Sequence, residues 1–292
     1  MTSQTVLVIF GPTASGKSSD AMKVANKHDC TIINADSLQI YKDLRILTSR
    51  PSIQDEKKNV HKLYGILSGD ENCSVSKWLN LAKKEIKVSL KKNKLPIIVG
   101  GTGMYIKGLI DGISPIPDIP DHIRNETQDL IKKNGYQHLY NVLLKKNKNL
   151  KIEPNDKQRI QRAYNVFQGT GKIIEDWHQD NKKVMNDISF KVVIKDIDRD
   201  SLYKKCEKRF DDMISNGGID EVSRLLDMKY DKELTIMKAI GVREIAQFLK
   251  NEISLDHAIL QTKQKTRNYI KRQITWIKSN NITQNDDFKK YI

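Results

Sequence analysis

The stretch Gly11-Pro12-Thr13-Ala14-Ser15-Gly16-Lys17-Ser18 decides how the rest of this sequence is interpreted. It fits the pattern Gly-x-x-x-x-Gly-Lys-Ser/Thr, in which the glycines let backbone N–H groups point inward around phosphate oxygens. In such a loop the lysine neutralises phosphate charge, and the hydroxyl of the last residue is a ligand for Mg²⁺. We therefore expect Gly11–Ser18 to bind phosphate, with Ser18 as the candidate metal ligand.

The segments on either side have the context that this loop requires. Thr5–Phe10 is a short apolar run that predicts a buried strand, and a helix is expected from Lys17 to about Lys27. The N-terminus of that helix adds roughly half a positive charge beside the loop. Further strands are expected at Thr31–Asn34 and Pro96–Val99, with an amphipathic helix at Ser76–Lys92. This alternation predicts an α/β fold with a P-loop NTPase-like parallel sheet core.

The character of the sequence changes at Ile113–Pro120, where three prolines fall within eight residues. From Asp121 the chain is polar, rich in Lys and Asn, and helical in pattern until Phe190–Lys195 predicts a returning strand. We therefore expect a catalytic core formed by residues 1–115 and 188–292. An inserted all-helical subdomain is expected at residues 116–187. Residues 280–292 are expected to be an exposed tail.

Composition bounds the class of protein. The chain has 292 residues, of which 38% are hydrophobic and 30% are charged, as in globular proteins. No run of ~18 apolar residues is present, so we expect a cytoplasmic protein that does not enter a membrane. The three cysteines form no Cys-x-x-Cys pair, which disfavours a disulfide scaffold or a structural zinc site. The net charge of +15 suits a nucleic-acid partner, or simply a lysine-rich surface that raises solubility.

Asp36 follows the predicted strand Thr31–Asn34 directly. An acidic residue there lies at the carboxyl end of the sheet, beside the phosphate loop, where open α/β sheets bind their ligands. A carboxylate in that place is a candidate general base. The same residue, or Ser37, is equally suited to cap a following helical turn.

Six segments in the same order resemble the tRNA dimethylallyltransferase family, also called tRNA isopentenyltransferases. They are GPTASGKS at 11–18, ADSLQIY at 35–41, VGGTGMY at 99–105, PNDKQRIQRA at 154–163, KAIGVRE at 238–244 and TRNYIKRQITWIK at 266–278. The matches span nearly the whole chain. A phosphate loop alone is common, whereas this ordered set is highly specific.

The sequence departs from the family pattern at several positions. Val242 stands where the family usually has Tyr, and His61-Lys62 stands where two histidines are usual. The stretch Lys42–Pro51 is an altered form of the family's RG-[ML]-DIGTAKP. Within it the family's glycines are replaced by Asp43 and Leu47, its Asp by Arg45 and its Lys by Arg50.

The resemblance implies a reaction. The donor is dimethylallyl diphosphate, and the acceptor is the exocyclic N6 amine of the adenosine that lies 3′ of the anticodon. Pyrophosphate leaves, so ATP hydrolysis is not required. The implied partners are the anticodon stem-loop of tRNA and the donor, with Mg²⁺ as cofactor and a monomeric enzyme.

The resemblance also implies roles for individual residues. Lys17 and the loop amides hold the diphosphate, and Asp36 takes the proton of the amine. Arg243 is similar to a phosphate-contacting arginine, with an exposed helical arginine as the alternative. Thr102 is similar to a threonine near the reacting phosphate, with the N-cap of a helix near Gly103 as the alternative.

The implied tRNA contacts lie in four segments. They are Asp36, Ser37, Leu38 and Gln39; Arg124, Gln158, Arg159 and Arg162; Lys238 and Arg243; and Arg267, Lys271, Arg272 and Gln273. A solvated basic face is the alternative for Arg159 and Arg162, which lie one helical turn apart. Trp276 suits base stacking, but a structural role is favoured.

Three other functions fit part of this pattern. An adenylate isopentenyltransferase shares much of the core, but it would have no use for the basic insertion. A small-molecule P-loop kinase would leave VGGTG and KRQITW without a purpose. An RNA-binding protein with a vestigial phosphate loop would account for the altered stretch Lys42–Pro51.

Overall fold

The computed structural model describes residues 4–178, 183, 185, 187–195, 197–280, 282 and 284–292. Its strands are β1 (Gln4–Phe10), β2 (Cys30–Asn34), β3 (His61–Lys62), β4 (Leu95–Gly100) and β5 (Ile188–Ile194). Its α-helices are α1 (Lys17–Ala25), α2 (Ile53–Lys58), α3 (Val75–Lys91), α4 (Gly103–Asp111), α5 (Asp121–Lys146), α6 (Lys157–Thr170), α7 (Ile174–His178), α8 (Arg199–Met213), α9 (Ile219–Asp227), α10 (Val242–Leu249) and α11 (Leu255–Ser279). Short helical turns are η1 (Ile214–Gly218), η2 (Ile236–Lys238) and η3 (Phe288–Tyr291).

The five strands form one sheet in the order β3-β2-β4-β1-β5, and every pair of neighbours is parallel. This arrangement confirms the predicted α/β class, and the predicted returning strand pairs with β1 as β5. Parallel strands end at the same edge of a sheet. The phosphate loop after β1, the turn after β2 and the glycine loop after β4 therefore meet at that edge.

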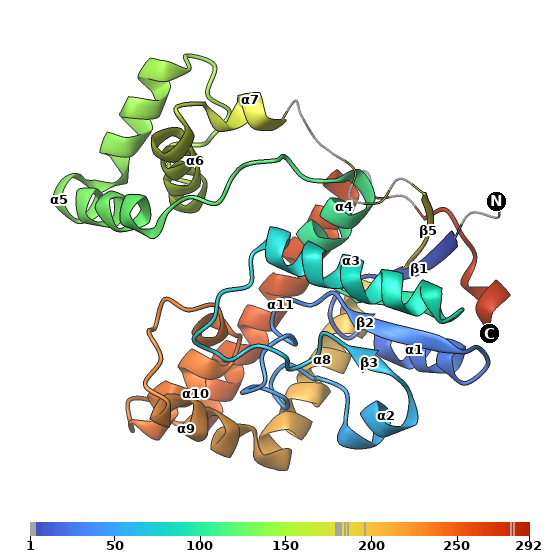
Figure 1. Cartoon of the computed structure of the whole chain (residues 1–292). Helices are drawn as coiled ribbons and strands as arrows, with labels where there is room; N and C mark the ends of the chain where they lie inside the picture. The colour runs from blue at the N-terminus through green and yellow to red at the C-terminus, as the bar shows by residue number, and fades with distance from the viewer. Residues whose placement is uncertain are drawn as a thin grey trace. The chain divides into compact units, whose positions relative to one another are not determined.

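Alternating side chains along the strands supply the two faces of the core. Leu7, Ile9, Ile97 and Val99 form one cluster with the buried residues of α1. Figure 1 shows α1 and α3 on opposite faces of the sheet. On the α3 side the fully buried Trp78 donates its indole N–H to the carbonyl of Asn34 at 2.8 Å. Helix α3 is thus fixed to the carboxyl end of β2.

The structure divides into two compact units. One comprises Met1–Ile110 and Met185–Ile292, and the other Asp111–Val184. The sequence predicts that the insertion begins at residue 116, later than this boundary. The difference arises because the proline-rich segment packs against the insertion. The Ile119 side chain lies so close to Gly169 of α6 that a Cβ there would stand 2.9 Å from Ile119 Cδ1. The insertion has its own core, built around Leu139, Leu143 and Ile160.

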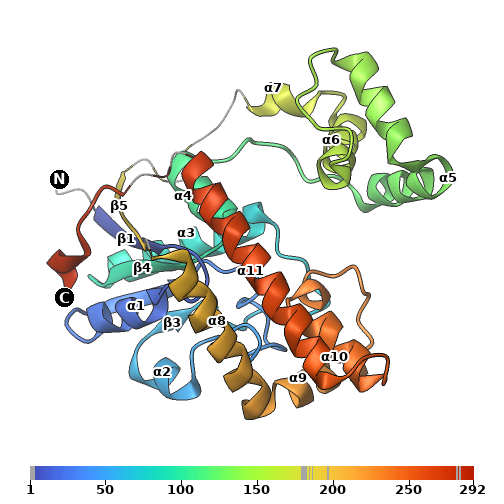
Figure 2. The same cartoon turned by 180° about the vertical axis from the view of Figure 1, so that it is seen from behind.

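Helices of the C-terminal region pack on one another in the first unit. Figure 2 shows α11 running alongside α8, and Leu202, Cys206 and Ile270 form the cluster between them. Trp276 on α11 meets Phe10 edge-on, with ring centroids 6.2 Å apart. A Cβ at Gly103 would lie 2.3 Å from the Trp276 ring, so glycine is required there. Trp276 therefore has the structural role that the sequence favoured.

The C-terminal segment is not the exposed tail that the sequence predicted. The backbone N–H of Asn285 donates to Val192 O at 3.1 Å, and its side-chain oxygen accepts from Val192 N at 2.7 Å. Phe288 and Tyr291 then pack against the cluster on the α1 side of the sheet. The reason is that β5 is an edge strand with unpaired backbone groups. The tail satisfies these groups and covers the edge.

We predict that Phe288→Ala lowers the free energy of unfolding by about 1–3 kcal/mol, because a half-buried aromatic ring loses its packing. Thermal or urea unfolding measures the change. The matched control is Lys289→Ala, since Lys289 is exposed beside it. Equal stability of both variants would contradict the docking of this segment.

Candidate active site

The phosphate loop connects β1 to α1 in the backbone geometry that phosphate binding needs. Gly16 has φ 83°, and Ala14 has φ 58°. The left-handed conformation costs a non-glycine residue roughly 1–2 kcal/mol, so the surrounding contacts must impose it at Ala14. Helix α1 begins at Lys17, which directs the N-terminus of the helix at the loop.

Lys17 lies inside the loop. Its ammonium donates to Pro12 O at 2.5 Å and to Ser15 Oγ at 3.4 Å. Burial lowers the pKa of Lys17 to about 8, nearby Asp36 raises it, and nearby Arg209 lowers it further. The cation is therefore held in a site that favours an added negative charge.

A cavity of about 390 Å³ opens over this loop. The loop itself lines it, together with residues from the turn after β2, the glycine loop after β4 and two helices of the C-terminal region. The lining side chains that can contact a ligand are Lys17, Ser18, Asp36, Gln39, Thr48, Ser49, Lys205, Arg209 and Gln273. This volume lies within the range of small-molecule sites.

Asp36 performs the capping that its sequence position suggested and also faces the cavity. Its Oδ1 accepts hydrogen bonds from Leu38 N at 2.9 Å and Gln39 N at 3.4 Å. Buried Asn34 holds the backbone on both sides of it, accepting from Asp36 N and donating to Asp36 O. Among the described residues, no hydrogen bond engages Asp36 Oδ2. One oxygen thus fixes the carboxylate while the other remains available for a proton.

Thr102 joins two loops at the same edge of the sheet. Its hydroxyl accepts from Ser37 N at 2.9 Å, while its carbonyl accepts the first helical bonds of α4. The residue therefore occupies the cap position of α4. It is not among the residues that line the cavity.

Arg209 and Lys205 of α8 are cavity residues that the sequence analysis missed. Arg209 Nη2 donates to Thr13 Oγ1 at 2.6 Å, which places the guanidinium at the crown of the phosphate loop. Their spacing of four residues puts both on one face of the helix, and this was the signal available in the sequence.

Arg243, the predicted phosphate ligand, is exposed and does not line the cavity. Its neighbours Val242 and Ile245 are buried and fix the rotation of α10, which turns Arg243 outward. Arg209 lines the cavity over the phosphate loop, and the contact of Arg243 with phosphate stays a prediction.

Gln273 was predicted to contact tRNA, but its side chain is buried at the phosphate loop. Its Oε1 accepts from Thr13 N at 2.9 Å, and its Nε2 donates to Gly101 O at 3.0 Å. Both ends of the amide are thus used by the protein. Gln273 joins the phosphate loop to the glycine loop.

Most of the other predicted tRNA contacts lie on helices, and these helices occur in both units. Arg267 pairs with Glu207, and Lys238 pairs with Glu233 at 2.9 Å. Lys271 and Arg272 are exposed on α11. In the insertion, Arg124, Gln158, Arg159 and Arg162 are exposed, with Arg124 3.7 Å from Asp121 and Arg159 2.5 Å from Asp156. Ser37 and Leu38 are half-buried beside Asp36.

Few side chains at this site could ligate a metal ion. No cluster of three or more His, Cys, Asp or Glu side chains suited to a metal occurs in the part of the chain that the structure describes. Ser18 and Asp36 nevertheless line the same cavity and offer a hydroxyl and a carboxylate oxygen. Mg²⁺ commonly takes one or two such protein ligands together with phosphate oxygens and water. The residues present therefore fit Mg²⁺ in the company of a phosphate ligand.

No described helix is long and apolar enough to cross a bilayer.

Comparison with known proteins identifies close relatives. The family model for IPP transferase matches residues 39–280. The tRNA dimethylallyltransferase of Pelagibacter ubique is 43% identical over 276 residues, covering 94% of this chain and 88% of the relative. That of Rhodospirillum rubrum is 39% identical, covering 94% of this chain and 85% of the relative.

Solved structures give the same picture. The crystal structure of tRNA delta(2)-isopentenylpyrophosphate transferase from Staphylococcus epidermidis matches with a TM-score of 0.68 and 29% identity, covering 98% of this chain and 94% of that one. A eukaryotic dimethylallyltransferase acting on tRNA matches with a TM-score of 0.79 and 27% identity, covering 94% of this chain and 70% of that one.

We predict that binding of an organic diphosphate weakens as pH rises through about 8, the pKa of Lys17 in the free protein. Binding weakens with rising pH because the ammonium form of Lys17 attracts the anion and the neutral amine does not. The last ionisation of the diphosphate has a lower pKa of ~6, so the charge of the ligand stays constant over this range. Calorimetry between roughly pH 7 and pH 10 should show Kd rising toward tenfold per pH unit above 8.

Lys17→Met is the control for this dependence. It should bind weakly at every pH and lose the dependence. A wild-type Kd that stays constant over the range would contradict the assignment to Lys17.

Proposed function

The chain belongs to the IPP transferase family, and on that premise we propose that it modifies tRNA by prenyl transfer. It transfers a dimethylallyl group from dimethylallyl diphosphate to the N6 amine of the adenosine 3′-adjacent to the anticodon, and it releases pyrophosphate. The observation that carries this proposal is a single cavity into which a phosphate loop, a carboxylate and the cations of α8 all open. We further propose that the enzyme acts as a monomer in the cytoplasm.

The diphosphate of the donor binds in the phosphate loop. Backbone N–H groups, the Lys17 ammonium and the Arg209 guanidinium surround the position that its oxygens would occupy. Negative charge develops on the leaving group as the C–O bond breaks, and donors already in place stabilise it without reorganising. Arg209 is fixed to Thr13 before the substrate arrives, so its orientation is set in advance.

Asp36 acts as general base toward the acceptor amine. The lone pair of an exocyclic adenine amine is delocalised into the ring, so the amine needs to lose its proton as the new C–N bond forms. Asp36 Oδ1 is held by two backbone N–H groups, which leaves Oδ2 to accept that proton. Proton transfer to a positioned side chain contributes typically ~10²–10⁴-fold.

Mg²⁺ would be held by Ser18 and by oxygens of the donor, with Asp36 within the same cavity. When bound, the ion supplies positive charge that neutralises the diphosphate. The chain's own contribution is to orient the ligand oxygens.

The exposed cations hold the tRNA. Lys271 and Arg272 on α11 and the exposed arginines of α5 and α6 suit phosphate contacts, which position a nucleic acid without reading its sequence. The target adenosine must leave its stack, at a cost of a few kcal/mol that such contacts offset. The overall charge of +15 adds to the attraction.

The decisive experiment offers labelled dimethylallyl diphosphate and Mg²⁺ in parallel to tRNA with adenosine at the target position and to free AMP. We expect label in tRNA alone. Label in AMP alone would make the protein a nucleotide prenyltransferase. Label in neither would overturn prenyl transfer and favour the binding-protein alternative.

We predict that Asp36→Asn lowers turnover by at least ~100-fold and leaves tRNA affinity within about twofold. The amide oxygen of Asn can still accept from Leu38 N, so the turn should survive while the base is lost. Single-turnover transfer and filter binding of tRNA measure the two effects. The control Asp70→Asn removes an equal charge at an exposed site. A loss of less than tenfold at Asp36 would mean that another group is the base.

A further inference from the structure

Residues 41–51, which we term the wall loop, contain four of the departures from the family pattern and also form one side of the phosphate cavity. Thr48 and Ser49 line the cavity. Gln39 Nε2 donates to Thr48 O at 2.8 Å and to Ser49 O at 3.2 Å, so the two residues are held as a pair. Ser49 has φ 52°, and its buried Oγ has no hydrogen-bond partner among the described residues.

Arg45 and Arg50, which stand where the family has Asp and Lys, both donate hydrogen bonds to backbone carbonyls of the wall loop. Arg45 donates to Pro51 O, and Arg50 Nη1 donates to Tyr41 O at 3.1 Å. The Arg50 guanidinium lies directly on Gly65, where a Cβ would stand 1.9 Å from Nη1. Arg50 thus connects the two ends of the wall loop, and Arg45 connects its middle to its C-terminal end.

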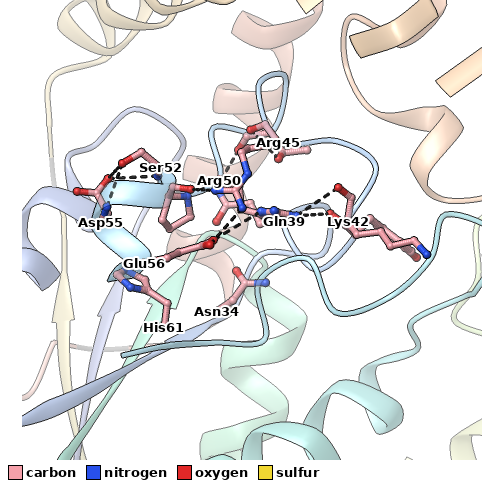
Figure 3. A network of polar contacts seen from close by, with 12 residues as sticks. Asn34, Gln39, Lys42, Arg45, Arg50, Ser52, Asp55, Glu56 and His61 are labelled. Carbon is pink, nitrogen blue, oxygen red and sulfur yellow. Dashed lines mark hydrogen bonds and ion pairs between the residues drawn. The ribbon is translucent and has the colours of Figure 1, made fainter. Parts of the chain in front are cut away.

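Glu56 is the carboxylate that these two cations share, as Figure 3 shows. Its Oε2 lies 3.1 Å from Arg45 Nη2, and its Oε1 lies 3.9 Å from Arg50 Nε. The position of Glu56 is set by α2, whose first turn is closed by a reciprocal pair: Ser52 Oγ accepts from Asp55 N, and Asp55 accepts from Ser52 N. The central residue of the triad Arg45–Glu56–Arg50 is therefore held by a capped helix.

Arg50 is the least solvated charge of this triad. The Arg50 side chain is only 9% exposed, and its Nε has no hydrogen-bond partner among the described residues. Burial lowers the pKa of Arg50, neighbouring Arg45 lowers it further, and Glu56 raises it. Removing one partner from such a group leaves uncompensated buried charge. Without Glu56, the two guanidinium groups would repel each other across the base of the wall loop.

A second anchor holds the first half of the wall loop independently of Glu56. The buried Glu221 carboxylate accepts hydrogen bonds from the backbone N–H groups of Arg45, Ile46 and Leu47, at 2.7–3.0 Å. Loss of Glu56 should therefore displace Thr48–Pro51 without releasing the whole loop.

We propose that Glu56 is a positioning residue for the diphosphate site: it holds Arg45 and Arg50 together and so keeps Thr48 and Ser49 in the cavity wall. This inference rests on the proposed function, because the ligand that the wall meets is the diphosphate of the donor. Because Thr48 and Ser49 line the cavity, we expect them to meet the diphosphate in the ground state and the transition state alike. Loss of such uniform contact raises KM and leaves kcat unchanged.

The test measures the Kd of inorganic pyrophosphate with Mg²⁺ by calorimetry, and kcat and KM for dimethylallyl diphosphate with tRNA in excess. We expect Glu56→Gln to weaken pyrophosphate binding and raise the donor KM by about tenfold each, with kcat within about twofold. The matched control is Glu252→Gln, an exposed glutamate in the same unit. A purely structural defect would instead lower the active fraction and hence kcat, at unchanged KM.

Two further variants keep the inference testable if Glu56→Gln folds poorly. Glu56→Asp retains the charge and should give an intermediate KM. The double variant Arg45→Gln/Glu56→Gln removes the repulsion and should be no worse than Glu56→Gln alone. Unchanged Kd and KM in all three variants would overturn this inference only. A wild-type protein that binds no pyrophosphate would overturn the proposed function as well.

Discussion

The parallel pairing of β1 with β4 on one side and β5 on the other is the constraint on which the rest of this structure depends. Because all five strands run the same way, the loops that follow them gather at one edge. The phosphate loop follows β1, the strand between β4 and the edge strand β5, and a Cβ at Gly11 would lie 2.9 Å from the Cβ of Lys195, the residue after β5. The edge strand and its C-terminal cover therefore adjoin the phosphate loop.

Two helices from the C-terminal region complete the loop. Gln273 of α11 accepts the N–H of Thr13, and Arg209 of α8 donates to its hydroxyl. One residue at the crown of the loop is thus held from both sides. Because the cluster of Leu202, Cys206 and Ile270 packs α8 against α11, the two side chains are positioned together. A substitution that alters this packing would therefore shift Gln273 and Arg209 at the phosphate loop, although the substituted residue contacts no ligand.

The site contains partly buried charged groups, and each has an opposite charge nearby within the protein. Buried Lys17 is offset by Asp36, whose own carboxylate is fixed by two backbone N–H groups. Arg45 and Arg50 are offset by Glu56. Such arrangements are costly to break, because removing one member leaves a charge without a partner. They also set the cavity electrostatics before any substrate binds.

The sequence by itself determined the parallel α/β core, the phosphate loop, the place of Asp36 and the family, because these depend on local patterns and short ordered motifs. It did not reveal that Arg209 faces the cavity while Arg243 faces solvent, since the rotation of α8 and α10 is set by long-range packing. It predicted a free tail where the structure has a cover for β5, because an edge strand is known only once the sheet order is known. It also left the altered wall loop unexplained, because Glu56 reaches Arg45 and Arg50 only after the chain has folded back on itself.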